Sequence, residues 1–239
     1  MIIELMKLSE ILTPSFKPCR RDSLVVPTVD SDFCHEAVAR GWLTVEQMRR
    51  AARRYRLGRS RSGRTIFWMI DESGFVRDGH IGHAWASQML KQREPELLKN
   101  MHTEHCLFGL HLLSETQIAS NCPQISSSVK NVAEERPACI VEKERSAVVL
   151  SELFPKQVWL AVSYLQNFTI DRLEPLTGHR ITLFPATDPM MDTYVSWLDI
   201  ADQARRAYQL DITVSSLLED KATSEQKMRC IDLAEFILE

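Results

Sequence analysis

The second half of the chain alternates short apolar runs with amphipathic segments, and this alternation restricts the fold more than any other feature. Strand-like runs occur at residues 138–142, 157–162, 179–184 and 210–214. Helix-like segments separate them, and the longest follows Asp188 with apolar residues at helical spacing: Tyr194, Trp197, Ala201, Ala204 and Tyr208. Strands that alternate with helices predict βαβ units and a parallel sheet flanked by helices. We expect an α/β domain over residues 137–239.

A last helix is predicted from Thr223, because Gln226 three residues later completes a capping-box pattern. It is expected to bury Met228, Ile231 and Leu238.

A smaller α+β region is predicted over residues 1–113. Thr44 and Gln47 form a capping box at the start of a basic helix that ends at Gly58. Alternating apolar residues at 66, 68 and 70, followed by "DESG", predict a strand and a hairpin turn. Residues 114–136 are polar and rich in serine, so we interpret them as a linker or long loop.

The composition excludes several classes of protein. Hydrophobic residues make up 44% of the 239 residues and charged residues 26%, as in ordinary globular proteins. No apolar stretch is long enough to cross a bilayer, and the N-terminus lacks the apolar core of a signal peptide. The six cysteines form no C-x-x-C pair, which favours reduced thiols and a cytoplasmic location.

Positive charge is concentrated near the N-terminus. Residues 1–64 hold thirteen Lys and Arg against seven Asp and Glu, a net charge of +6, in a chain whose total is −3. Eight arginines lie between residues 49 and 64. We expect seven of them to contact the phosphates of DNA or RNA: Arg49, Arg50, Arg53, Arg54, Arg59, Arg61 and Arg64. The alternative is an ordinary solvated helix face.

Two acidic residues lie at strand ends, where parallel sheets bind ligands. Glu142 closes the first strand of the α/β domain, and Asp188 follows the third. If these strands are neighbours, the two carboxylates converge and suit Mg²⁺, with Glu142 available as an acid or base. Alternatively, Asp188 caps the next helix with Pro189 at its first position, Asp192 complements the helix dipole, and Glu142 pairs with Lys143 or an arginine.

The histidines allow a zinc site, although their spacing fits no compact zinc finger. The candidate ligands are His80, His83, His102, His105 and Cys106. Surface or hydrogen-bonded histidines are the simpler interpretation.

Three features of the domain occur together: Glu142 at a strand end, a strand ending "AVSYLQN" and a strand leading into "FPATDP". In these features it resembles a Toprim domain, the catalytic fold of bacterial primases, type IA and II topoisomerases and related nucleases. The resemblance is closer to Toprim-like proteins that accompany primase and mobilisation functions on bacterial mobile elements. Matching segments, such as "YRLGRSRSGRTIFWMIDESGFVRDGHI" and "EHCLFGLHLL", extend it from Tyr55 to the C-terminus.

The resemblance implies a Rossmann-like fold, a nucleic-acid substrate and Mg²⁺-dependent phosphodiester chemistry. It implies that Glu142 is the general acid/base and that Asp188, with Asp192 as a further candidate, binds the metal. The first Asp of the family's Asp-x-Asp pair falls on Ala186, which has no ligand atom. Related sequences often have a further acidic residue and a glycine shortly after this pair, where this chain has Met190 and Met191. At the glycine-containing turn typical after the second strand, this chain has Ser163–Tyr164.

Three functions therefore remain open. The chain is expected to be a primase- or nuclease-related enzyme, a non-catalytic nucleic-acid-binding module, or an adaptor for replication or mobilisation proteins.

Overall fold

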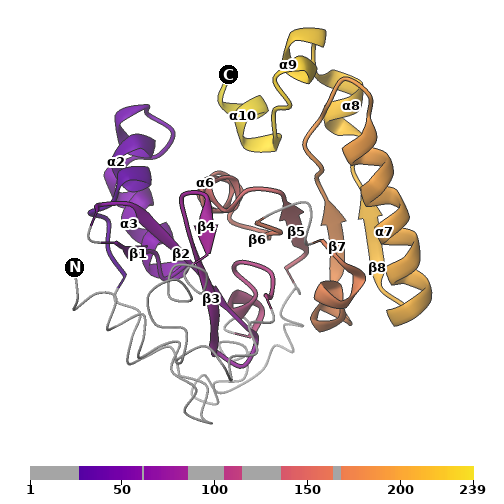
Figure 1. The fold of residues 1–239 in the computed structure, drawn as a ribbon, viewed down its shortest axis with the longest axis horizontal. Helices are drawn as coiled ribbons and strands as arrows, with labels where there is room; N and C mark the ends of the chain where they lie inside the picture. Colours follow the sequence, from indigo (N-terminus) through magenta and orange to yellow (C-terminus); the bar gives the residue numbers. More distant parts are fainter. Residues whose placement is uncertain (1–26, 61, 86–104, 115–135, 164–167) are drawn as a thin grey trace, which may run out of the picture. The chain divides into compact units, whose positions relative to one another are not determined.

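The structure is a computed structural model that describes residues 27–60, 62–85, 105–114, 136–163 and 168–239 (Figure 1). The chain divides into two compact units, residues 1–111 and 112–239. The predicted linker lies outside the described residues, except at its two ends.

The described residues of the first unit combine two helices with an antiparallel sheet. The helices are α2 (Asp32–Ala39) and α3 (Val45–Arg54). The strands, in the order β1-β2-β3-β4, are β1 (Gly58–Arg59), β2 (Thr65–Ile70), β3 (Val76–Ile81) and β4 (Ala84–Trp85). Every residue of β2 is buried, so both faces of this strand are covered.

Local sequence signals position the elements of this unit. Thr44 and Gln47 form the predicted capping box at the start of α3. The "DESG" segment is a hairpin turn, in which one carboxylate oxygen of Asp71 accepts hydrogen bonds from the backbone N–H groups of Ser73 and Phe75. The helix ends before Gly58, because Arg56 takes the left-handed conformation. Gly58 lies in β1, where a Cβ would approach the Trp68 ring nitrogen to 2.6 Å.

The second unit contains a four-stranded parallel sheet, which confirms the α/β prediction. Its order is β6-β5-β7-β8, and its strands are β5 (Ala138–Val141), β6 (Val158–Ala161), β7 (Arg180–Leu183) and β8 (Asp211–Val214). β5 and β6 are buried throughout, as expected for parallel strands covered on both faces.

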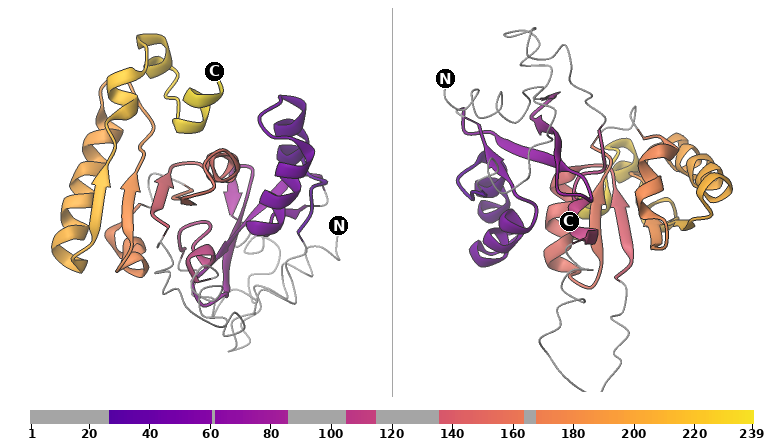
Figure 2. Two further views of the ribbon diagram at one scale, coloured as in Figure 1. Left: turned by 180° about the vertical axis from the view of Figure 1, so that it is seen from behind. Right: turned by 90° about the horizontal axis from the view of Figure 1, so that it is seen from below.

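Helices connect these strands. α6 (Glu144–Leu153) joins β5 to β6, the 3-10 helix η4 (Ile170–Leu176) precedes β7, and α7 (Asp192–Tyr208) joins β7 to β8. α7 runs alongside β8 in Figures 1 and 2. It buries Trp197 against Phe168, with 4.7 Å between the ring centroids. The two connections run in opposite directions along the sheet, and the right-handed crossover usual for parallel strands is expected to place α6 and α7 on opposite faces.

The C-terminal region differs from the prediction of one helix. Three short helices follow β8: α8 (Leu217–Lys221), α9 (Ser224–Met228) and α10 (Leu233–Leu238). Thr223 and Gln226 do form a capping box, but Cys230 takes a left-handed conformation and ends that helix. Asp232 then begins a new helix with its own capping box to Glu235. Met228 is consequently 70% exposed rather than buried.

Candidate functional site

The carboxyl ends of β5 and β7 lie side by side at one edge of the sheet, and the predicted acidic residues Glu142 and Asp188 follow these two strands. β5 pairs directly with β7, so Glu142 and the segment 184–188 follow neighbouring strands. From β5 the chain passes to β6, and from β7 it passes in the opposite direction to β8. Such a switch in direction is where open α/β sheets usually bind ligands.

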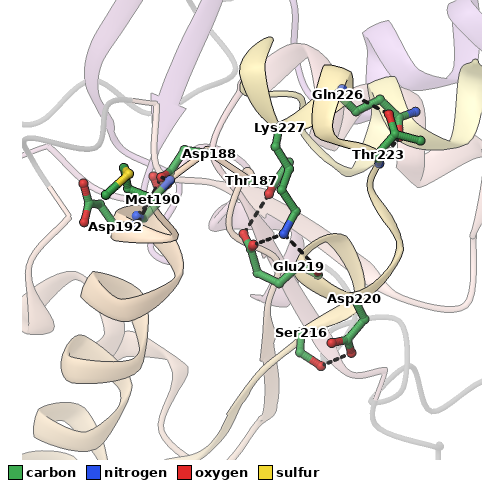
Figure 3. Close-up of polar contacts among 11 residues, drawn as sticks. Thr187, Asp188, Met190, Asp192, Ser216, Glu219, Asp220, Thr223, Gln226 and Lys227 are labelled. Atoms are coloured by element: carbon green, nitrogen blue, oxygen red, sulfur yellow. Dashed lines mark hydrogen bonds and ion pairs between the residues drawn. The ribbon is translucent and has the colours of Figure 1, made fainter.

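Asp188 directs its carboxylate at the backbone of the next helix. One oxygen accepts hydrogen bonds from the N–H groups of Met190 (2.9 Å) and Asp192 (3.1 Å), and the other accepts one from Thr193 (2.9 Å) (Figure 3). Burial raises the pKa of Asp188, but the hydrogen bonds from Thr193, Asp192 and Met190 outweigh this effect and lower the pKa overall. The carboxylate therefore stabilises the start of α7.

The geometry of this cap differs from the simple Asp-Pro cap. α7 begins at Asp192 rather than at Pro189, and the residue in the N-cap position is Met191, in the left-handed conformation. Asp188 thus caps the helix across an intervening turn. Asp192 is exposed in the first helical turn, where a negative charge complements the helix dipole.

Thr187 connects the end of β7 to the C-terminal region, a role that no sequence pattern indicates. Its hydroxyl donates a hydrogen bond to Glu219 Oε1 (2.8 Å), and its N–H donates one to the carbonyl of Ile231 (3.0 Å). Lys227 Nζ donates to Glu219 Oε2 (2.8 Å) and to the Glu219 carbonyl (2.9 Å) (Figure 3). The Glu219 side chain is 5% exposed and the Lys227 side chain 22%, so the carboxylate of this ion pair is buried and its cation is half-buried. Neighbouring Ala186 is also buried.

A second charged cluster lies beside Glu142. Lys143 Nζ donates a hydrogen bond to Glu235 Oε2 (2.9 Å) and lies 3.5 Å from Asp232 Oδ2. Ser146 Oγ, in the first turn of α6, donates to the same Asp232 oxygen (2.5 Å). The Asp232 side chain is fully buried, so the ammonium and the hydroxyl compensate its charge.

These charges also affect the partly buried Glu142. Burial raises the pKa of Glu142; the charge of Lys143 opposes this, and the negative charges of Asp232, Glu235 and Glu144 add to it. Burial lowers the pKa of Lys143, but Asp232 and Glu235 outweigh burial and raise it overall. Glu142 is therefore a carboxyl group that holds its proton to a higher pH than a free glutamate does.

Ser163, at the place where the resemblance to Toprim domains predicts a glycine turn, lies beyond β6. Its φ is 73°, a conformation that favours glycine, and its N–H donates a hydrogen bond to the Glu142 carbonyl (2.9 Å). Its buried hydroxyl has no hydrogen-bond partner among the described residues. Tyr164 lies outside the described residues.

The predicted metal ligands are not assembled into a cation site in the described part of the chain. Within those residues, no three His, Cys, Asp or Glu side chains are arranged so that they could hold a metal ion. Asp188 gives both carboxylate oxygens to backbone N–H groups, and a lysine ammonium lies against the carboxylates next to Glu142. The residues present therefore fit Mg²⁺ poorly.

The candidate zinc ligands lie in different environments. His80 is buried on β3, His83 is exposed, and His102 lies outside the described residues. His105 Nε2 lies 2.8 Å from Oδ2 of the buried Asp78, and the His105 ring packs on Trp85 with 4.1 Å between centroids. No local sequence pattern indicates this pairing, because 27 residues separate the two partners.

The arginine-rich segment lies on α3 and in the hairpin between β1 and β2. α3 buries Met48, Ala51 and Ala52, which leaves the arginines toward its other side. Five arginines are exposed: Arg49, Arg50, Arg53, Arg59 and Arg64. Arg54 is half-buried, and Arg61 lies outside the described residues.

Ion pairing leaves much of this positive charge exposed. Arg49 pairs with Glu46 (2.6 Å) and Arg59 lies 3.5 Å from Asp30, but both pairs are exposed and weak in water. The side chains of Arg53 and Arg64 form no ion pair with any other described residue. An exposed basic segment of this kind can bind an anionic polymer.

The molecule is thus a mixed α/β protein with a parallel sheet, whose carboxyl edge is covered by its own C-terminal residues. No helix among the described residues is long and apolar enough to cross a membrane.

Residues 37–122 and 126–187 match the family described as domain of unknown function DUF6371, and the chain belongs to this family. The matched ranges include Glu142 and the arginine-rich segment, and they end one residue before Asp188. No curated protein and no solved structure matches the chain.

Proposed function

We propose that the protein is a cytoplasmic nucleic-acid-binding module, in which a Toprim-like domain serves as scaffold and the arginine-rich segment contacts phosphates. The observation that carries this proposal is the group of exposed arginines on α3 and the β1–β2 hairpin. Arginine suits phosphate because its planar guanidinium can donate two parallel hydrogen bonds to one phosphate group. A role beside replication or mobilisation proteins of a mobile element agrees with the Toprim resemblance.

The arrangement of the carboxyl edge supports binding rather than catalysis. The Asp188 carboxylate accepts hydrogen bonds from three backbone N–H groups. Ala186 offers no ligand atom at the position of the first Asp in the Asp-x-Asp pair of Toprim domains. Phosphodiester chemistry in such folds depends on carboxylates that hold divalent cations at this edge.

The experiment measures binding of fluorescent single-stranded DNA, double-stranded DNA and RNA by anisotropy, at several salt concentrations. We expect the double variant Arg53→Gln/Arg64→Gln to bind more weakly and to lower the slope of log K against log salt by about 1 to 2 for a duplex. Arg206→Gln is the matched control, because Arg206 is an exposed arginine on α7 of the other unit. Glu142→Gln should bind like the native protein.

Absence of binding to all three nucleic acids at low salt would overturn the proposal and favour the protein-adaptor function. Equal losses in the Arg206 control and in the double variant would show general attraction to positive charge rather than a binding segment.

A second candidate is Mg²⁺-dependent phosphodiester chemistry, because the pKa of Glu142 is raised at the edge where a general acid is expected. It predicts turnover of a nucleic acid with Mg²⁺ or Mn²⁺ that Glu142→Gln abolishes. Lack of any product with either cation would eliminate this candidate.

A further inference from the structure

The C-terminal residues 215–239 cover the carboxyl edge and contact it through polar groups. Ile231 accepts a hydrogen bond from the Thr187 N–H, and Glu219 accepts one from the Thr187 hydroxyl. Asp232 and Glu235 contact Lys143 and Ser146, next to Glu142. These hydrogen bonds and ion pairs join the segment to Thr187, which follows β7, and to Lys143 and Ser146, which follow β5.

We propose that residues 215–239 form a strap that closes over the carboxyl ends of β5 and β7, and that it opens as a unit while the sheet stays folded. Opening exposes Glu142 and Thr187. Opening of the strap does not require nucleic-acid binding by the first unit.

The composition of the strap explains why it opens before the sheet. Its helices have only five, five and six residues, and such short helices are marginal without packing. α9 has no buried residue. β5 and β6, by contrast, are buried along their whole lengths. Segments with few buried apolar contacts open at lower free energy than buried strands do.

The strap buries four apolar side chains, Leu218, Ile231, Leu233 and Ala234, and its buried carboxylates make its closure adjustable. Asp232 is fully buried and depends on Lys143 and Ser146 for compensation. Glu219 is nearly buried and depends on Lys227 and Thr187. Loss of one partner leaves a buried carboxylate uncompensated, which favours the open state, where water solvates that carboxylate.

Opening also changes the environment of Glu142. In the closed state, burial and the negative charges of Asp232 and Glu235 raise the pKa of Glu142. When the strap leaves, water reaches this carboxyl group and the two charges move away, so the pKa of Glu142 falls. The Glu142 carboxyl group therefore stays protonated in the closed state over a pH range in which it would be ionised in the open state.

Amide hydrogen exchange, measured with increasing urea below the unfolding transition, tests the strap. In the full-length protein, residues 215–239 and the Thr187 amide should exchange at lower urea than β5 and β6. In Asp232→Asn, exchange of the strap should accelerate roughly ten- to a hundredfold, as expected when a buried charged hydrogen-bond partner is lost. Asp211→Asn is the control, because it makes the same substitution at an exposed residue of β8.

A strap that exchanges only together with β5 and β6, in the native protein and in Asp232→Asn alike, would overturn the proposal. If Asp232→Asn does not fold, Lys143→Gln provides a milder change, because the Lys143 side chain is 42% exposed.

Discussion

The arginine-rich segment of the first unit and the carboxyl edge of the second use their charged residues in opposite ways. Arg53 and Arg64 are exposed, and within the described residues their side chains form no ion pair. Asp232 and Glu219 are buried and are compensated by Lys143, Ser146, Lys227 and Thr187. Charged groups that are compensated within the protein contribute to its structure. Exposed charged groups remain available to a partner.

The contrast explains why acidic residues at a strand end do not by themselves indicate catalysis. Asp188 lies where the sequence predicts a metal ligand, yet its oxygens accept backbone hydrogen bonds. Capping and metal binding call for the same residue type at the same position. The hydrogen-bond partners distinguish the two roles, and they are visible only in the structure.

The largest effect is expected when the exposed charge of the first unit is removed. The quadruple variant Arg49→Gln/Arg53→Gln/Arg59→Gln/Arg64→Gln should reduce duplex affinity at low salt by about a hundredfold or more, and it should lower the salt slope by about 3 to 4. Anisotropy titrations measure both quantities. Affinity unchanged by the four substitutions would show that these arginines are only a solvated surface.

The next largest effect is expected for the buried charge of the second unit. Lys227→Met leaves the Glu219 carboxylate without its cation, and we expect the free energy of unfolding to fall by about 2 to 3 kcal/mol. Lys221→Met removes an exposed lysine from α8 and should change it by less than about 0.5 kcal/mol. Urea denaturation followed by circular dichroism measures both. Similar losses in the two variants would contradict the distinction between buried and exposed charge.

A smaller effect separates the two roles of Asp188. Asp188→Ala removes an acceptor of three N–H groups and should cost about 1 kcal/mol, whereas Asp188→Asn retains a good cap and should cost little. Because hydrogen bonds lower the pKa of Asp188, its contribution is present above pH 3.8 and is lost as the pH falls through the lowered pKa. Asp192→Ala should cost about 0.3 to 1 kcal/mol through the helix dipole.

Thermal unfolding with and without Mg²⁺ completes the test of Asp188. A large stabilisation by Mg²⁺ in the native protein that disappears in Asp188→Asn would establish a metal ligand and contradict the capping role.

The smallest effect is the pH dependence due to Glu142. The pKa of the folded state is raised above the ordinary 4.5, so the folded protein binds more protons between these two values and loses stability as the pH rises through this window. Glu142→Gln removes this loss. The variant should therefore gain stability relative to the native protein between pH 4.5 and neutral pH, but not below pH 4.5. Parallel pH profiles in urea denaturation would contradict a raised pKa.

Much of the fold follows from patterns that are local in the sequence. Alternating apolar runs predicted the four parallel strands, and the capping boxes at Thr44 and Thr223 are present in the structure. The C-terminal region was predicted less well, because Cys230 takes a left-handed conformation that no local signal indicates. One predicted helix is therefore two, and Met228 is exposed.

Local sequence patterns are sufficient to predict the strands, most of the helices and the position of Glu142 and Asp188 at one edge of the sheet. These features depend on the apolar periodicity of neighbouring residues and on the rule that parallel strands share a carboxyl edge. The partners of the charged groups at that edge depend on tertiary packing. Ser146 and Asp232 are 86 residues apart and Thr187 and Glu219 are 32 apart, yet each pair shares a hydrogen bond. Such pairs depend on how distant segments pack, and no local pattern encodes them.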